Sequence, residues 1–408
     1  MTADAFKAAR FDSSESNPVT TFGLHRRDKA RWLAGMSSTE GEEPEPLPSR
    51  HTDRGEHVCI IVLNWNGWQD TIECLESLLR LSYPSYTVVV CDNASSDDSW
   101  DQIHLWASGN LTASCTNPKL AHLTSPPVAK PVPSISYSSP QASLSSPTFE
   151  CSLVLIQTGG NLGFAGGNNV GLRYALSQTD CEYFWLLNND TVVEADALSR
   201  MVEQMSVDQR VGICGSVLLG YTSPQTVQAF GGKRYGAWSG RILDMKHATQ
   251  PSPQSVSNSM DYVHGASMLV RREFLQTIGL MDEGYFLYFE EMDWAMRSRG
   301  RFRLGYAPLS IVYHKEGASI GTHARRQKRS LLAERYATRN RLLFTRKFHP
   351  ALVPSVLCFV ALTFVHRLLA GDPRRAGQIV AAAWEGLTCP KQPCVDMHSV
   401  KSGLAVPP

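Results

Sequence analysis

The feature that most constrains this chain is a strand–helix–strand pattern between Val58 and Asp92. The run "VCIIVLN" is continuously apolar and of strand length, which is typical of a strand covered on both faces. Residues 68–83 place apolar side chains on one side of a helix, and "YTVVVCD" then forms a second strand. We therefore predict a parallel unit whose binding groups lie beyond the carboxyl ends of its strands.

The same alternation of strands, turns and helices continues to His314, so we predict an α/β fold with a mixed, mainly parallel sheet flanked by helices. Further strands are expected in "SLVLIQ", "CEYFWLLN", "VGICGSVLL", "DYVHGASMLV" and "LGYAPLSIVYH", and a hairpin in "FGGKRYGAWSGRILDM".

Composition divides the chain into four regions. Residues 1–56 are polar and rich in Pro and Ser, which predicts a disordered extension. Residues 57–320 form the expected catalytic domain, with a Pro/Ser-rich surface insertion at about 108–150. A basic and apolar helical region at 321–388 and a tail at 389–408 complete the chain.

The totals exclude some classes of protein. The net charge is +1 and 43% of residues are hydrophobic, so the composition supports a full core and gives no reason to expect a nucleic-acid partner. The first residues lack the apolar segment of a secretory signal, and the ten Cys show no paired metal-type spacing. We therefore expect a reducing, cytoplasmic setting.

The stretch "ALVPSVLCFVALTFVHRLLAG" is apolar, with basic segments on both sides. It falls slightly short of the roughly 20 residues needed to span a bilayer, and it contains Pro354 and His366. We predict a helix that lies at the membrane interface. The alternative is a packing helix buried in the soluble domain.

Two features at strand ends are candidates for binding a nucleotide. Asp92 ends the second strand, although Asp is also common in turns and helix caps. The turn "GGNLGFAGGNN", which contains Asn161 and Gly163, has five glycines that permit close approach of phosphates to the backbone. It does not have the order of glycines that marks a dinucleotide-binding turn, and a flexible loop without a ligand is the alternative.

Asp190 ends a further hydrophobic strand in "LLNNDT", with Asn188 on the same side of the extended chain. Two oxygen ligands of this kind suit Mg²⁺ or Mn²⁺, and His314 at another strand end would add a nitrogen ligand that favours Mn²⁺. The alternative is that Asp190 caps a helix that starts at Thr191.

The segment "YFLYFEEMDWAMRSRG" places acids beside many rings. If a helix begins near Glu290, one side carries Glu290, Asp293, Trp294 and Arg297, while Glu291 projects about 100° away. One interpretation is an acidic first turn favoured by the helix dipole. The other is a general base whose pKa is raised by its apolar surroundings.

Seven segments, in order from Val58 towards His349, closely resemble the family 2 glycosyltransferases of the GT-A fold, in particular the bacterial rhamnosyltransferase-like branch. They are "IVLNWNG", "VVVCDNASSDDS", "NLGFAGGNNVGL", "LLNNDT", "HGASMLVRR", "FLYFEEMDWAMR" and "VYHKEGAS".

The resemblance implies a role for each candidate residue. The donor nucleotide would contact Trp65 and Asp92 at the base, Asn161 and Gly163 at the ribose and diphosphate, and Asn188 and Asp190 at the cation, with His314 completing the metal shell. Glu291 would be the catalytic base. The acceptor site would be formed by Gly265, Glu290, Asp293, Trp294 and Arg297.

The sequence departs from the family pattern at two of these positions. Asn188 replaces the first acid of the D-x-D metal motif, and Glu291 is one methylene longer than the usual Asp base. These departures leave open a catalytically silent protein that binds sugar nucleotides or acts in assembly. A nucleotidyltransferase is a further alternative, but "NWNGWQDT" lacks the basic, Gly-rich loop that it would need after the first strand.

The implied activity is inverting transfer of a sugar, with dTDP-rhamnose or a UDP-sugar as possible donors. The acceptor would be a hydroxyl of a glycan or of a lipid-diphosphate-linked glycan in cell-surface polysaccharide synthesis. A divalent cation, Mn²⁺ or Mg²⁺, would assist. The enzyme would sit at the cytoplasmic face of the cell membrane.

Overall fold

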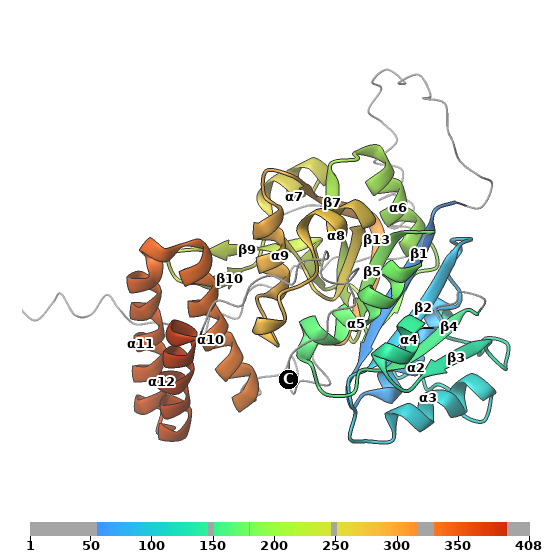
Figure 1. Cartoon of the computed structure of the whole chain (residues 1–408), viewed down its shortest axis with the longest axis horizontal. Coiled ribbons are helices and arrows are strands. Elements are labelled where there is room, and N and C mark those ends of the chain that lie inside the picture. Colours follow the sequence, from blue (N-terminus) through green and yellow to red (C-terminus); the bar gives the residue numbers. More distant parts are fainter. Residues whose placement is uncertain (1–54, 146–150, 179, 246–250, 317–329, 390–408) are drawn as a thin grey trace, which may run out of the picture.

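A computed structural model describes residues 55–145, 151–178, 180–245, 251–316 and 330–389 of the 408-residue chain. Its centre is a mixed sheet with helices packed on its two faces (Figure 1). The strand order is β10-β9-β8-β7-β12-β5-β1-β2-β4-β3, and β13 adds to β7 and β6. The predicted α/β class with a mixed sheet is therefore confirmed.

One half of the sheet is parallel. It consists of β3 (Ser134–Tyr137), β4 (Leu153–Gln157), β2 (Tyr86–Asp92), β1 (His57–Asn64) and β5 (Cys181–Asn188). The register pairs Asn64 with Asp92 and Leu63 with Asn188, so three strands end at one edge. The predicted parallel unit is confirmed, and its polar termini are brought together.

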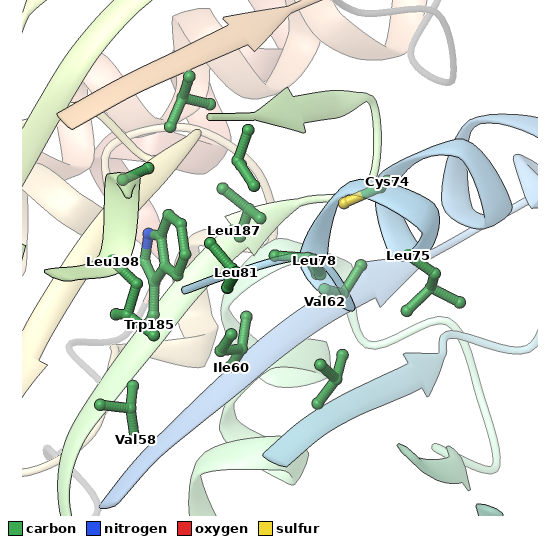
Figure 2. Packing of buried hydrophobic residues seen from close by; sticks show 14 of the residues in the cluster. Val58, Ile60, Val62, Cys74, Leu75, Leu78, Leu81, Trp185, Leu187 and Leu198 are labelled. Carbon is green, nitrogen blue, oxygen red and sulfur yellow. The ribbon is translucent and has the colours of Figure 1, made fainter. Parts of the chain in front are cut away.

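The continuous apolar run of β1 is explained by cores on both faces of the sheet. Val58, Ile60 and Val62 face helix α2 (Trp68–Leu78), while Cys59 and Ile61 belong to the opposite cluster. Figure 2 shows the first of these cores, in which side chains of β1 point toward those of α2 and β5. Burial on both sides fixes the register of β1 and hence the position of its polar end.

The other half of the sheet is largely antiparallel. β12 (Ser267–Arg271) lies between β5 and β7 (Val211–Gly220) and runs opposite to both. The predicted hairpin is formed by β9 (Gly232–Gly236) and β10 (Arg241–Leu243). The remaining strands of this half are β8 (Val227–Phe230) and β11 (Tyr262–Val263).

β13 (Arg303–His314) runs parallel to β7 and ends beside the short strand β6 (Thr191–Val193). Thr191 therefore continues as strand, and the next helix, α6 (Ala197–Val207), begins only after a further turn. The alternative in which Asp190 and Thr191 cap a helix is wrong.

The described part of the Pro/Ser-rich segment predicted to be an insertion forms regular elements. It contributes η2 (Ala121–Leu123), the edge strand β3 and α4 (Pro140–Ser145). Val132 and, in β3, Tyr137 have buried side chains. The segment therefore adds a strand to the edge of the sheet and contributes to the core.

Three helices follow the sheet, α10 (Leu331–Phe348), α11 (Val353–Leu369) and α12 (Pro373–Thr388), and they pack together at one end of the molecule (Figure 1). Leu343 and Phe344 of α10 share a core cluster with Tyr285, so α10 is integrated with the α/β domain. The other elements are α3 (Ser99–Ser108), α5 (Gly163–Ser177), α7 (Pro253–Ser259), α8 (Arg272–Ile278), η3 (Glu283–Tyr285), α9 (Glu290–Ser298) and η4 (Pro350–Leu352).

Helix α11 is apolar but mostly uncovered. Only Val356 and Val360 of this helix are buried, so the alternative of a buried packing helix is wrong. In the described part of the chain, residues 350–369 are the one helical segment long and apolar enough to cross a membrane, with a mean hydropathy of 1.9. Nearly all of the predicted disordered extension and of the tail lies outside the described residues.

Candidate active site

The predicted nucleobase pocket lies where β1 and β2 end. Asn64 Nδ2 donates to Asp92 Oδ1 over 2.8 Å, and the Ser95 hydroxyl donates to the same oxygen over 2.6 Å. The backbone N–H of Ser95 donates to Oδ2 over 3.2 Å. Asp92 is buried, while Trp65 beside it is half-buried. The carboxylate is thus held rigidly, and Oδ2 is the oxygen with more accepting capacity left for a ligand.

The Gly-rich loop follows β4 at the same edge. Asn161 Oδ1 accepts from Asn93 Nδ2 (3.1 Å) and from the backbone N–H of Gly163 (3.0 Å). Gly163 has φ of 70°, and a Cβ there would lie 2.2 Å from the carbonyl oxygen of Phe286. Only glycine is therefore accommodated at this position, which brings the loop against the turn that contains Phe286.

Asn188, Asp190 and His314 meet beside this edge. His314 Nε2 lies 3.3 Å from Asp190 Oδ1 and 3.5 Å from Asn188 Nδ2. His314 Nδ1 lies 3.0 Å from the side-chain oxygen of Gln228 on β8. An amide oxygen can only accept, so Nδ1 carries a hydrogen and Nε2 is the atom available to a cation.

This group fits a hard divalent cation. Burial by itself lowers the pKa of His314, but the Asp190 carboxylate raises it overall, so the surroundings of this ring favour positive charge. No cluster of three or more His, Cys, Asp or Glu that could hold a metal occurs among the described residues. The amide oxygen of Asn188 and phosphates of a ligand would therefore have to complete the coordination shell.

A turn of unusual backbone geometry leads into α9. We call residues 285–289 the aromatic turn. Phe286, Tyr288 and Phe289 have φ of 62°, 69° and 77°, in the region that L side chains rarely adopt. Each such residue costs on the order of 1–3 kcal/mol and persists only where its surroundings hold it, which is common at functional sites.

Asn340 of α10 holds the aromatic turn in place. Its side chain is fully buried, and Nδ2 donates to the carbonyl oxygens of Tyr285 (2.8 Å), Leu287 (2.8 Å) and Tyr288 (3.0 Å). On the other side, the N–H of Phe164 in the Gly-rich region donates to the carbonyl of Phe286 over 2.6 Å. The turn is therefore fixed by contacts from two distant parts of the chain.

Glu290 and Glu291 directly follow the aromatic turn. In each, Oε2 is buried without a hydrogen-bond partner among the described residues. Burial raises the pKa of Glu291 to about 7, and a hydrogen bond from its own backbone N–H acts in the opposite direction. Burial, together with the charge of Glu291, raises the pKa of Glu290 further. Near neutral pH, Glu291 is therefore the acid of this pair that ionises first.

The residues that enter β12 join this pair of acids to the cation group. A Cβ on Gly265 would lie 3.5 Å from Glu291 Oε1, so the carboxylate rests against this glycine. The next residue, Ala266, accepts the N–H of Asn188 over 3.1 Å. The preceding residue, His264, has its ring centroid 6.1 Å from that of His314. Residues 264–266 therefore link Glu291 to the Asn188–Asp190–His314 group.

Three side chains expected at the acceptor site are engaged inside the fold. Asp293 Oδ1 pairs with Arg297 Nε over 2.6 Å, and Asp293 Oδ2 pairs with Lys347 Nζ over 2.6 Å. Trp294 is fully buried, and its indole N–H donates to the carbonyl of Gly279 over 2.9 Å. Their surroundings favour a supporting role for α9 rather than direct contact with an acceptor. Glu290 and Gly265 lie beside Glu291, and their role at an acceptor site stays a prediction.

Sequence reasoning missed three residues of the site. Gln228 orients His314, Asn340 supports the aromatic turn, and His264 lies between the two groups. His264 directly precedes the glycine that was singled out, so its position was a usable signal. Gln228 lies in a short strand and Asn340 in a basic helix, where no local pattern marks them.

Comparisons with known proteins identify the family of the α/β domain. The family model described as glycosyl transferase family 2 matches residues 59–117 and 144–279. Its gap, residues 118–143, lies within the segment that was predicted to be an insertion.

Two curated relatives match part of the chain. One is the low-salt glycan biosynthesis hexosyltransferase Agl10 of Haloferax volcanii, 24% identical over 164 residues, which cover 35% of this chain and 45% of Agl10. The other is the rhamnosyltransferase WbbL of Escherichia coli, 24% identical over 204 residues, which cover 47% of this chain and 76% of WbbL. The chain thus aligns with less than half of Agl10.

Among solved structures, the mannosyltransferase PcManGT from Pyrobaculum calidifontis, in complex with GDP-Man and Mn²⁺, is similar at 15% identity and a TM-score of 0.45. The match covers 89% of this chain and 95% of that one. The family model, the relatives and the residues gathered at the strand ends lead to one conclusion: the chain belongs to glycosyl transferase family 2.

Proposed function

We propose that this protein transfers a sugar from a nucleoside-diphosphate sugar to a hydroxyl group of an acceptor, with inversion at the anomeric carbon. The observation that carries the proposal is that one short segment, residues 264–266, contacts both Glu291 and the Asn188–Asp190–His314 group. Displacement at an anomeric carbon needs a base on one side and charge stabilisation of the leaving diphosphate on the other.

Glu291 is the proposed base. A base works best when its pKa lies near the working pH, and burial brings the pKa of this carboxyl to about 7. Its buried Oε2 has no partner in the described structure, so an acceptor hydroxyl would satisfy it. The hydroxyl proton would move to Glu291 while the hydroxyl oxygen bonds to the anomeric carbon and the diphosphate leaves with the electron pair of the broken bond.

Asp190 and His314 would hold a divalent cation, with the Asn188 amide oxygen as a further ligand. When bound, the cation would neutralise negative charge that grows on the leaving diphosphate. Gln228 would keep His314 Nε2 directed at it through the 3.0 Å contact with Nδ1. On the opposite side of the nucleotide, Asp92 and Trp65 would contact the base, and Asn161 and Gly163 the ribose and diphosphate.

The relatives support a hexose donor and a glycan acceptor. WbbL is a rhamnosyltransferase, and Agl10 is a hexosyltransferase of glycan biosynthesis. We propose dTDP-rhamnose or a UDP-sugar as the donor and a glycan or lipid-linked glycan of the cell surface as the acceptor.

A thermal-shift screen of nucleotide sugars, with and without Mn²⁺, tests the donor half of this proposal. One donor should raise the melting temperature more than the others, and the increase should depend on the cation. Transfer assays with that donor would follow. If no nucleotide sugar binds in either condition, the proposed function is wrong; if one binds but is never transferred, the protein is a sugar-nucleotide-binding protein.

We also propose that the helices after the sheet bind a membrane surface peripherally, which would bring the site to a lipid-linked acceptor. The exposed face of α11 includes Leu362 (60% exposed) and Leu369 (84%), and Trp384 of α12 is 69% exposed. Leaving this much apolar surface in water is unfavourable, and Trp is common at membrane interfaces.

Flotation of the protein with vesicles that contain anionic lipids tests the membrane proposal. Replacing Leu362, Leu369 and Trp384 together by Glu should leave the protein in the soluble fraction. The matched control is Val207→Glu on α6, which changes an 82% exposed apolar residue far from these helices in sequence. Equal flotation of the triple variant and the control would contradict the proposal.

A further inference from the structure

His264 is a side chain of the site to which the proposed reaction assigns no task. It precedes Gly265, the glycine that contacts Glu291, and its ring meets that of His314 edge to face, with centroids 6.1 Å apart. His264 is therefore located between the proposed base and the cation ligands. In an inverting displacement, that is where the bond between the anomeric carbon and the leaving phosphate lies.

The hydrogen-bonding state of His264 follows from its neighbours. The backbone N–H of Ala266 donates to His264 Nδ1 over 3.1 Å, so Nδ1 is an acceptor and carries no hydrogen. The hydrogen of the neutral ring is consequently on Nε2. Nε2 has no hydrogen-bond partner in the described parts of the chain, and the side chain is only partly covered. The ring therefore presents one fixed, unused donor.

The surroundings of this donor favour an anion. Lys233 on β9 is close enough to His264 and His314 for its charge to oppose protonation of both rings. Lys233 forms an ion pair with Asp244 over 2.9 Å. The Asp244 side chain is 59% exposed, so solvent screens this pair and makes it weak. A neutral N–H donor beside an ammonium group and a cation site suits phosphate oxygens better than a sugar hydroxyl.

We propose that His264 Nε2–H donates a hydrogen bond to the β-phosphate of the donor nucleotide and so positions the leaving group. This inference rests on the proposed function, because it takes a nucleoside diphosphate as the ligand. The ring needs no change of protonation state for this role, since it donates as a neutral imidazole.

Two substitutions separate this role from a structural one. His264→Asn keeps an oxygen where Nδ1 accepts from Ala266, but it has no donor at the distance of Nε2. His264→Gln is longer and can present an N–H close to the Nε2 position. The full-length protein with Mn²⁺ would be titrated with UDP, dTDP and GDP by calorimetry, and the monophosphate of whichever nucleotide binds would follow.

We expect His264→Asn to weaken binding of the diphosphate by roughly 10- to 100-fold, the usual effect of removing a hydrogen bond to a charged group. Binding of the monophosphate should change little, and His264→Gln should retain most of the affinity for the diphosphate. Wild-type affinity in His264→Asn, or an equal loss for mono- and diphosphate, would overturn the inference. If the unchanged protein binds none of the nucleotides, the proposed function fails instead.

Discussion

The two halves of the proposed site are built in different ways. The proposed donor half, with Asp92, Asn188 and Asp190, is placed by the ends of parallel strands whose ladders continue through the sheet. The base half, with Glu291, follows a turn in which three residues have positive φ. Its position depends on side chains from outside the sheet, Asn340 above all.

This difference indicates where each half is vulnerable. A strand end is fixed by many backbone hydrogen bonds, so removing one neighbouring side chain should change ligand affinity but not the shape of the site. The aromatic turn is strained, so removing the side chain that holds it should displace the base. Substitutions in the base half are therefore expected to affect turnover, and those in the donor half to affect binding.

Glu291→Gln gives the largest expected effect. Removing the base should lower kcat by about a thousandfold, within the usual range for general base catalysis, because the amide cannot take the proton. Nucleotide affinity, measured by calorimetry, should stay the same because Glu291 belongs to the base half.

The matched control is Glu290→Gln, the same chemical change one residue earlier. It should retain far more turnover than Glu291→Gln. A reversed order, with Glu290→Gln the more damaging change, would move the role of base to Glu290.

Asn340→Leu should lower kcat by about a hundredfold, because a base displaced by about 1 Å loses that much. Leu has nearly the same shape as Asn, but it lacks the side-chain NH₂ group that donates to three carbonyl oxygens of the aromatic turn. Assays should be run well below the melting temperature of the variant, which we expect to fall. Thr345→Val, another buried polar residue of α10, serves as the control and should keep its kcat. A kcat that is equal in the two variants would show that the turn does not depend on Asn340.

Gln228→Leu tests the donor half. Loss of the partner of a metal-binding His commonly costs 10- to 100-fold in metal affinity, so the Mn²⁺ concentration needed for half-maximal nucleotide binding should rise about tenfold or more. Turnover at saturating Mn²⁺ should be nearly normal. Gln228→Glu keeps an acceptor for the Nδ1–H of His314 but loses the N–H that Gln228 donates to the His314 carbonyl over 3.0 Å, so it should recover part of the Mn²⁺ affinity that the Leu variant loses. An unaltered Mn²⁺ requirement in the Leu variant would contradict the proposed orientation of His314.

The pH dependence of kcat/KM should show the base directly. Glu291 has its pKa raised to about 7, so its active, ionised form predominates above that pH and is lost below it. We expect kcat/KM to fall about tenfold for each pH unit below 7 and to be level just above. A profile that stays level down to pH 5 would mean that no group of this pKa acts as the base.

The donor half was predictable from sequence because apolar runs mark strands and polar residues mark their ends. Asp92, Asp190 and His314 were each recognised in this way. Parallel pairing with β1 brings β2, which ends at Asp92, and β5, which leads to Asp190, to one edge of the sheet. The prediction was less complete for the Pro/Ser-rich segment, whose few apolar residues, such as Tyr137, still suffice for an edge strand.

The base half was predictable only in part. Helical spacing separates Glu291 from the side that carries Asp293 and Trp294, but it does not say which side packs inside the fold. The structure turns Asp293 and Trp294 inward and leaves Glu291 against Gly265. The role of Asn340 depends on a contact across about 50 residues of chain, which no local pattern encodes.

The central claim is that both halves form one site. A crystal structure of the protein with Mn²⁺ and its tightest-binding nucleoside diphosphate tests this claim most directly. We predict an anomalous peak for manganese in contact with Asp190 and His314, with the diphosphate lying between that peak and Glu291. A manganese ion bound elsewhere, or a nucleotide whose diphosphate points away from Glu291, would contradict the account.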